Sequence, residues 1–190
     1  MAVADTVKEE SKEAIKRLRD QGVESYMITG DNIRTARAIA KEVGIEEGKV
    51  MAEVMPEEKE HKVRELKESG KAVAFVGDGI NDAPALAVAD LGIAMGSGTD
   101  VAMETGDMVL VRGDPRDVLR AIKLAQATLR RIKLGMFWAF VYNILGIPIA
   151  AGLFSSLGIV LRAELAGLAM AMSSVSVVGN ALWLRKVKIS

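Results

Sequence analysis

The stretch Val73-Ala-Phe-Val-Gly-Asp-Gly-Ile-Asn-Asp-Ala-Pro-Ala-Leu86 begins with an apolar run and ends in glycines and carboxylates. Four or five apolar residues in succession predict a strand that is buried on both faces, as in a helix-covered parallel sheet. Asp78 and Asp82 offer the oxygen ligands that Mg²⁺ prefers, and Asn81 has an amide that can bond a phosphate oxygen. GDG alone would indicate a polar turn. The complete string predicts a Mg²⁺ and phosphate site.

A second stretch, Ser25-Tyr-Met-Ile-Thr-Gly-Asp-Asn32, repeats this plan of an apolar strand followed by a hydroxyl, a glycine and an acid. Two such strands side by side would bring their carboxyl ends to one crevice, where ligands bind in open α/β sheets. Asp31 and Asn32 have a second interpretation, because both residue types cap helices well.

The first 120 residues alternate between helical and strand patterns. Helices are predicted over 9–21, 33–43, 57–69, 83–89 and 100–104, and strands over 25–29, 73–76, 91–95 and 108–111. This alternation predicts an α/β fold, a parallel sheet with flanking helices. His61, the only histidine, falls in a charged helix and is expected on a solvated face.

Composition excludes several classes of function. The 190 residues have a formal net charge of zero, so no basic excess indicates nucleic acid binding. Cysteine is absent, which rules out disulfides and thiolate metal sites within this chain. The first residues lack the basic region and apolar core of a signal peptide.

Two apolar segments, 134–154 and 165–184, have no ionisable side chain and are each long enough to cross a bilayer. They predict an α-helical transmembrane hairpin. Basic residues lie at both outer ends of the pair, so both ends and the charged block are expected on the cytoplasmic side of a cell membrane. The expected organisation is a partial α/β domain over 1–120, a juxtamembrane helix over 121–133, the hairpin over 134–184 and a basic cytoplasmic tail over 185–190.

The spans also contain polar residues: Tyr142 and Asn143 in the first, Met170 and Ser174 one helical turn apart in the second. Such residues commonly join membrane helices to one another. The alternative is an ion site. A thioether with hydroxyl and amide oxygens, without a carboxylate, suits a soft monovalent cation better than Zn²⁺.

Three strings occur in the chain in this order: TGDN, Pro-x-x-Lys at 56–59, and GDGIND. Through these strings the chain resembles the phosphorylation domain of P-type ATPases, which has the haloacid dehalogenase-like fold. The two spans resemble the last two membrane helices of the copper(I)-transporting branch. The resemblance implies that Thr29 holds the phosphoryl group, Lys59 neutralises it and Asp78 binds Mg²⁺, while Asn81 and Asp82 order the loop and the attacking water. It places Gly30, Asp31, Asn32 and Asn81 near the nucleotide. It assigns transported Cu⁺ or Ag⁺ to four residues: Tyr142, Asn143, Met170 and Ser174.

Two strings of that family are missing here, the phosphorylated Asp-Lys-Thr-Gly-Thr and the Cys-Pro-Cys of an earlier membrane helix. The resemblance therefore implies the C-terminal part of a longer pump, inactive alone, with ATP bound by a domain outside this chain. One alternative is a membrane-anchored phosphatase of the dehalogenase type with Asp5 as nucleophile, although Val7 stands where such enzymes usually have a second Asp. Another is a catalytically silent module that binds Mg²⁺ and phosphate.

Overall fold

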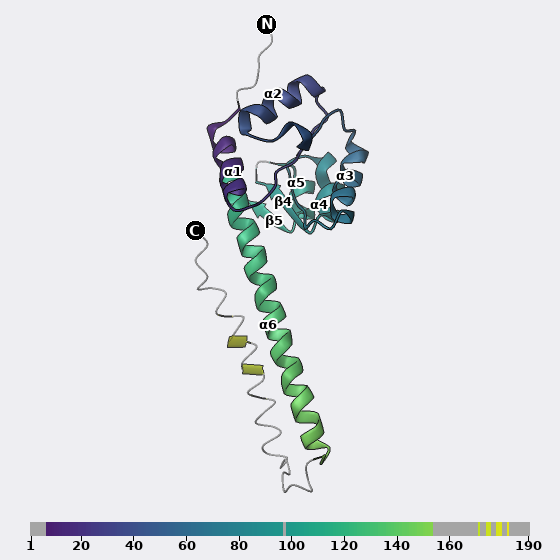
Figure 1. The fold of residues 1–190 in the computed structure, drawn as a ribbon, viewed down its shortest axis with the longest axis vertical. Helices are drawn as coiled ribbons and strands as arrows, with labels where there is room; N and C mark the ends of the chain where they lie inside the picture. Colours follow the sequence, from purple (N-terminus) through teal and green to yellow (C-terminus); the bar gives the residue numbers. More distant parts are fainter. Residues whose placement is uncertain are drawn as a thin grey trace. The chain divides into compact units, whose positions relative to one another are not determined.

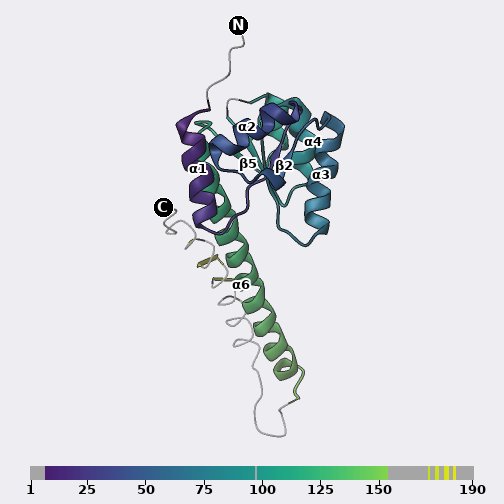
Figure 2. The same ribbon diagram turned by 45° about the horizontal axis from the view of Figure 1, so that its top comes forward.

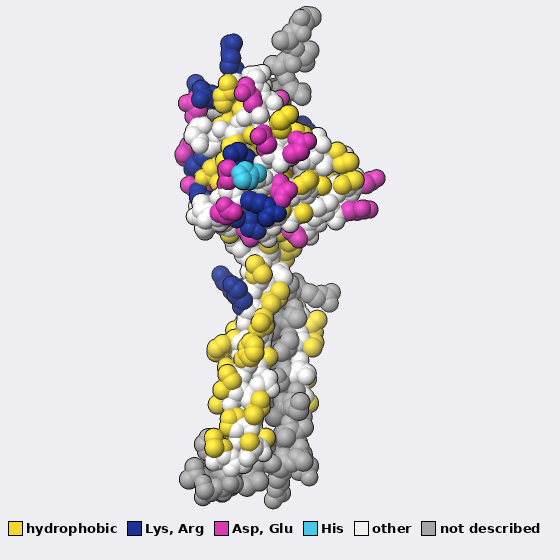
Figure 3. Space-filling view, turned by 90° about the vertical axis from the view of Figure 1, so that its right-hand side faces the viewer, with side chains coloured by type: hydrophobic (Ala, Val, Ile, Leu, Met, Phe, Trp, Pro, Cys, Tyr) yellow, Lys and Arg dark blue, Asp and Glu magenta, His cyan; other side chains and the backbone are white. Residues whose placement is uncertain are grey.

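The computed structural model describes residues 7–96 and 98–153, and further along only 171, 174, 175, 178, 179 and 182. The chain divides into two compact units, Met1–Ile122 and Lys123–Ser190, which are described separately. In the space-filling view the first unit shows side chains of both charges, whereas the described part of the second shows mostly hydrophobic ones (Figure 3). This division agrees with the charge pattern of the sequence.

The first unit alternates helices and parallel strands, as the sequence predicts (Figure 1). The α-helices are α1 (Glu9–Asp20), α2 (Ile33–Val43), α3 (Pro56–Glu68), α4 (Ala83–Val88), α5 (Asp100–Thr105) and α6 (Val118–Ala150), which continues into the second unit. The strands are β1 (Met27–Ile28), β2 (Val50–Met51), β3 (Ala74–Gly77), β4 (Leu91–Met95) and β5 (Met108–Leu110). The described residues also form short 3-10 helices: η1 (Glu47–Lys49), η2 (Ile80–Asp82) and η3 (Pro115–Asp117).

Local sequence explains the ends of α2. Asn32 caps its N-terminus, because the Asn32 side chain accepts a hydrogen bond from the Thr35 N–H at 3.0 Å. Gly44 ends the helix with a φ of 86°, a left-handed conformation that glycine adopts without a steric penalty. Ala36, Ala40 and Val43 lie on one helical face and are buried.

The core of the first unit is built on both faces of the parallel sheet β3-β4-β5. On one face Ile93 packs with Leu18 of α1 and with Val118 and Ala121 at the start of α6. On the other face Ala94 packs with Leu86 of α4 and Ala102 of α5. Figures 1 and 2 accordingly show α1 on one side of the strands and α4 on the other. β4 is therefore the strand that is buried on both faces.

The prediction that 73–76 form a doubly buried central strand is wrong. β3 lies at an edge of its sheet, and Val76 is 39% exposed, because no described element pairs with its outer edge or covers this residue. The expected pairing of the two motif strands is not observed either: β1 pairs in parallel with β2, in a separate two-stranded sheet. The sequence did not predict β2, whose two residues are too few to show a periodicity.

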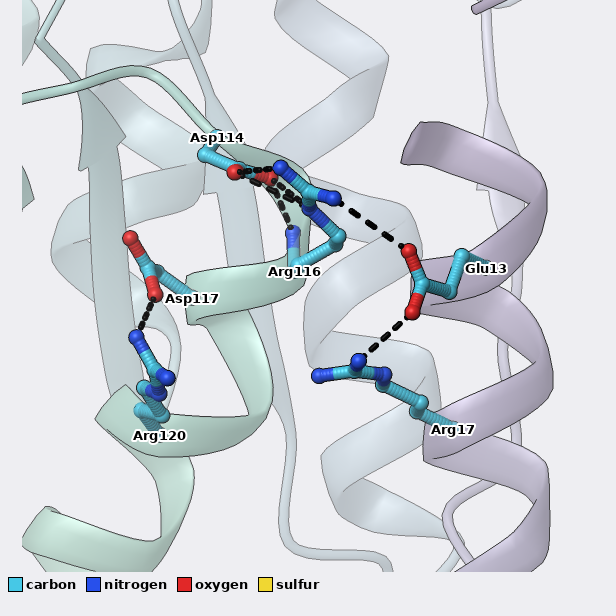
Figure 4. Close-up of polar contacts among 6 residues, drawn as sticks. All are labelled: Glu13, Arg17, Asp114, Arg116, Asp117 and Arg120. Carbon is cyan, nitrogen blue, oxygen red and sulfur yellow. Dashed lines mark hydrogen bonds and ion pairs between the residues drawn. The ribbon is translucent and has the colours of Figure 1, made fainter. Parts of the chain in front are cut away.

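A network of ion pairs joins α1 to η3. The Arg116 guanidinium bonds the Asp114 carboxylate at 2.7 to 3.0 Å and reaches Glu13 at 3.3 Å. Figure 4 shows the Glu13 carboxylate between Arg116 and Arg17. Arg116 lowers the pKa of Asp114 to about 2 through these hydrogen bonds. Hydrogen bonds first from Arg17 and then from Arg116 also hold the pKa of Glu13 below its ordinary value.

In the second unit, α6 is one continuous helix up to Ala150. Among the described residues this helix alone, taken with the turn from Pro115, is long and apolar enough to cross a membrane. Its apolar side chains are open in the described structure: Phe137, Phe140 and Ile144 are each more than half exposed. Most of the predicted second span, 165–184, lies outside the described residues.

Candidate functional site

The site begins with a partly buried ion pair between α3 and η2. The Lys59 ammonium donates a hydrogen bond to Oδ1 of Asp82 at 2.7 Å, and the two side chains are 19% and 10% exposed. Pro56 and Glu58 fix the start of α3: Pro56 occupies its first turn, and the Glu58 carboxylate accepts a hydrogen bond from the Met55 N–H at 2.9 Å. Lys59 is thus directed into the protein, unlike an ordinary surface lysine.

Asp82 organises the loop that follows β3. Its Oδ2 accepts hydrogen bonds from the backbone N–H of Gly79 at 3.2 Å and, at the weak distance of 3.3 Å, from that of Asp78. A Cβ on Gly77 would lie 2.7 Å from the Cβ of Asp82, so only glycine fits there. The GDGIND string therefore builds a turn around the Asp82 carboxylate, and both carboxylate oxygens already have partners.

Asp78 differs from Asp82 in exposure and in contacts. It follows β3 directly, it is exposed, and its carboxylate has no hydrogen bond or ion pair within the described part of the chain. One open carboxylate fits Mg²⁺, which keeps several waters and takes few protein ligands. Asp78 would hold the ion, while the competing donors around Asp82 make that residue the poorer ligand. When bound, Mg²⁺ supplies positive charge that stabilises a phosphoryl group during transfer.

A second pair of groups follows β1. The Thr29 hydroxyl donates a hydrogen bond to Asp31 Oδ2 at 2.9 Å and accepts one from the Asp31 N–H at 3.2 Å. Asp31 therefore orients Thr29 and does not cap α2, so the capping interpretation is right for Asn32 and wrong for Asp31. Gly30 lies between them, and a Cβ on it would be 3.5 Å from the Val54 carbonyl oxygen.

The structure joins these groups only in part. Over residues 7–96 and 98–153, no hydrogen bond or ion pair links Thr29 or Asp31 to Lys59, Asp78 or Asp82, and Asn81 is exposed. Sequence reasoning also missed two supports of the Asp78 backbone. The Thr99 N–H donates to the Asp78 carbonyl oxygen at 2.9 Å, and a Cβ on Gly98 would lie 2.5 Å from that oxygen. The glycines that follow β4, Gly96 and Gly98, could have predicted that two backbone segments approach closely there.

The candidate ion ligands in the membrane segment are described only in part. Asn143 donates a side-chain hydrogen bond to the Ala139 carbonyl oxygen at 2.9 Å, which satisfies part of its amide within α6. Tyr142 is 41% exposed, and its ring lies 6.3 Å from that of Trp138. Ser174 has helical backbone, while Met170 lies outside the described residues. The predicted set of four ligands stays a prediction.

Comparison with known proteins identifies the family. A model of haloacid dehalogenase-like hydrolases matches residues 1–90. A copper-exporting P-type ATPase of Staphylococcus epidermidis is 55% identical over 100% of this chain and 23% of its own length. The "Probable copper-importing P-type ATPase A" of Enterococcus hirae is 52% identical over 100% of this chain and 25% of its own length. The chain belongs to the P-type ATPase family. It spans about a quarter of the length of these curated relatives.

Solved structures agree with membership of the P-type ATPases. A zinc-transporting PIB-type ATPase in the E2.Pi state has a TM-score of 0.78 and 40% identity, over 95% of this chain and 28% of its own. The catalytic domain of the CPx-ATPase CopB-B has a TM-score of 0.55 and 31% identity, over 60% of this chain and 45% of its own. The α/β unit is thus a haloacid dehalogenase-like phosphorylation domain.

Proposed function

We propose that this chain is the Mg²⁺- and phosphate-binding part of an ATP-driven pump that exports Cu⁺ or Ag⁺ through an aspartyl-phosphate intermediate. The observation that carries the proposal is the Lys59–Asp82 pair beside the open Asp78 carboxylate, at the carboxyl end of β3. Phosphoryl transfer needs positioning and charge neutralisation more than covalent chemistry, and these groups can supply both.

Each side chain has a distinct role in this proposal. Asp78 would hold Mg²⁺, which would supply positive charge to the phosphoryl group. Lys59 places an ammonium next to the phosphoryl oxygens, while Asp82 keeps that ammonium in place and shapes the loop through Gly79. The Thr29 hydroxyl, which donates to Asp31 in the free site, would turn to donate to a phosphoryl oxygen when phosphate is bound. Gly30, Asp31 and Asn81 would contact the nucleotide, and Asn81 and Asp82 would also order the attacking water.

The nucleophile has to come from outside this chain. The outer edge of β3 is unpaired in the described structure, so a strand that ends in Asp-Lys-Thr-Gly-Thr can pair there and deliver its aspartate to the site. The remaining partners are the nucleotide-binding and dephosphorylating domains, the Cys-Pro-Cys helix and the lipid bilayer. The relatives favour this pump over a membrane-anchored phosphatase that uses Asp5.

Copper is the proposed ion because the curated relatives that name it are 52 to 56% identical to this chain, against 40% for the zinc-transporting structure. The chemistry agrees. A divalent ion in a low-dielectric interior needs formal negative charge nearby, and neither apolar segment contains an acidic residue. A thioether from Met170 with Tyr142, Asn143 and Ser174 suits Cu⁺. Several of these relatives are named as copper exporters and one as a copper importer, so export is the proposed direction.

The test is ion-stimulated ATP hydrolysis by the full-length pump that contains this chain. Cu⁺ should stimulate turnover, whereas Zn²⁺ should not. Asn143→Ala and Met170→Ala should reduce Cu⁺ stimulation while phosphorylation from inorganic phosphate is retained. Met172→Ala is the matched control. In the predicted helix, where both methionines lie outside the described residues, a side chain two positions further on would point away from that of Met170. Stimulation by Zn²⁺ alone would overturn the ion assignment.

The proposed topology, a multi-pass protein with its α/β domain in the cytoplasm, has its own test. Single cysteines at Ser155 and Ser190, both outside the described residues, should react with impermeant reagents from opposite sides of sealed vesicles. The chain has no native cysteine that would interfere. Reaction of both positions from one side would contradict the hairpin.

A further inference from the structure

The loop between β2 and α3 contains an unusual backbone conformation. Among the described residues, Glu53 is the only one other than glycine with a positive φ, which is 57°. This left-handed region is disfavoured for any residue that has a Cβ. Strained conformations of this kind persist where the surrounding structure holds them, and they concentrate at functional sites.

The bend at Glu53 holds the loop that contains Thr29. The Thr29 N–H donates to the Met51 carbonyl oxygen at 3.0 Å, and the Val54 N–H donates to the Thr29 carbonyl oxygen at 3.0 Å. Between these two bonds the Glu53 N–H donates to the Asp31 carbonyl oxygen at 2.9 Å. Val54, which is 6% exposed, fixes the far side of the bend in the protein interior. The backbone around Thr29 is therefore bonded to the bend at three points.

The same bend leads directly into the helix that contains Lys59. Pro56 begins α3 three residues after Glu53, and Lys59 lies in the first turn of that helix, where it reaches Asp82. No hydrogen bond joins the Thr29 and Lys59 side chains in the described part of the chain. The short segment 51–56 is thus the covalent and hydrogen-bonded connection between the two groups that would contact a phosphoryl group.

We infer that the left-handed bend at Glu53 sets the position of Lys59 relative to Thr29, and that it does so through its backbone and not through its carboxylate. The carboxylate is exposed and has no hydrogen bond or ion pair with the described residues. Glu53 is a positioning residue for phosphoryl transfer, so the inference rests on the proposed function. It predicts that conformational preference at position 53 matters and that charge there does not.

The experiment uses the full-length pump and labelled inorganic phosphate, and measures the phosphate concentration that gives half-maximal phosphoenzyme. Glu53→Val, which disfavours the left-handed conformation further, should raise this concentration about 5- to 10-fold. Glu53→Gly, which adopts the conformation freely, and Glu53→Gln, which removes only the charge, should stay within about 2-fold of wild type. Gly22→Val is the matched control, because Gly22 has a φ of 74°, its added Cβ would meet nothing within 4 Å, and it precedes β1.

A double variant separates positioning from general destabilisation. Lys59→Ala alone should raise the half-saturating phosphate concentration about 10- to 100-fold, through loss of a charge-assisted contact. If Glu53 acts by positioning Lys59, Glu53→Val should add less than about 2-fold in the Lys59→Ala background, because the two effects are coupled. The inference would be overturned if the fold-changes of the two single variants multiplied in the double variant. It would also be overturned if Glu53→Gln raised the half-saturating phosphate concentration as much as Glu53→Val. If Lys59→Ala itself matched wild type, the proposed function would fail instead.

Discussion

Two clusters of opposite charges in the first unit differ in burial and in what they touch. At the α1–η3 junction, Arg116 makes several bonds to Asp114 and one to Glu13, yet Arg116 and Glu13 are 40% and 42% exposed (Figure 4). At the candidate site, Lys59 makes one ion pair within the described residues, with a carboxylate that is 10% exposed and also bonds loop amides. Exposed pairs contribute little to stability, whereas breaking a buried pair is costly. The number of bonds is therefore a poor guide to which cluster matters more.

The largest expected difference is in activity. Lys59→Ala in the full-length pump should slow turnover about 100-fold, because a positioned charge that stabilises developing phosphoryl charge is lost. Lys62→Ala is the matched control on the same helix. Within the described residues Lys62 pairs only with Glu65, at 3.0 Å and partly exposed, and its removal should leave turnover unchanged. If the two substitutions changed turnover equally, the effect would come from replacing any lysine of α3 and not from losing the charge of Lys59.

The next effect is on stability. Asp82→Ala removes the acceptor for Lys59 and for the Gly79 N–H, and should lower the free energy of unfolding by about 2 to 3 kcal/mol. Denaturant titration of the complete chain in detergent, followed by circular dichroism, measures this value. Asp20→Ala, at the exposed end of α1, should change it little. If Asp82→Ala left the free energy of unfolding unchanged, the carboxylate would serve catalysis alone and not stability.

Some of the features behind these predictions could be predicted from the sequence, and others could not. Periodicity and end signals located α2 and β4 correctly, since Asn32, Gly44 and a run of small apolar residues act locally. The position of β3 at a sheet edge was missed. An apolar run shows that a strand can be buried, but it does not show whether another strand or helix of the chain packs against it. The Glu53 bend was missed for a similar reason. Hydrogen bonds to Thr29 and Asp31, more than twenty residues away, hold this bend, and a local pattern does not show them.

Acid should weaken two exposed groups of ion pairs over a defined range: the junction around Arg116, and Glu24 with Lys71 and Lys49. The pKa of Asp114 is lowered to about 2 by Arg116, and that of Glu24 is lowered to about 2 by hydrogen bonds from Lys71 and then Lys49. Since the unfolded carboxyls titrate near 4, the unfolded state binds more protons below that pH, and stability falls as the pH drops from about 4 to about 2. Denaturation midpoints at several pH values should show this slope. Asp114→Asn and Glu24→Gln should each flatten it, and an unchanged slope would contradict the two pKa shifts.

The smallest effect is expected from Arg17→Ala at the junction. Arg17 and Glu13 are 50% and 42% exposed and lie four residues apart on α1, so water and salt already screen their attraction. The unfolding midpoint should fall slightly at low salt and not detectably at about 1 M salt. A loss that persists at high salt would mean that the arginine stem, and not its charge, supports the packing of α1.

The central claim is that this chain supplies the Mg²⁺ and phosphate contacts of a phosphorylation site whose nucleophile lies on another segment. Its most direct test is acid-stable labelling with radioactive ATP and Mg²⁺. The chain alone should take up no label, and adding a separate piece that contains the Asp-Lys-Thr-Gly-Thr strand and the nucleotide-binding domain should restore it. Asp78→Ala should abolish the restored label, while Asp20→Ala should not. Labelling of the isolated chain that disappears in Asp5→Ala would contradict the account.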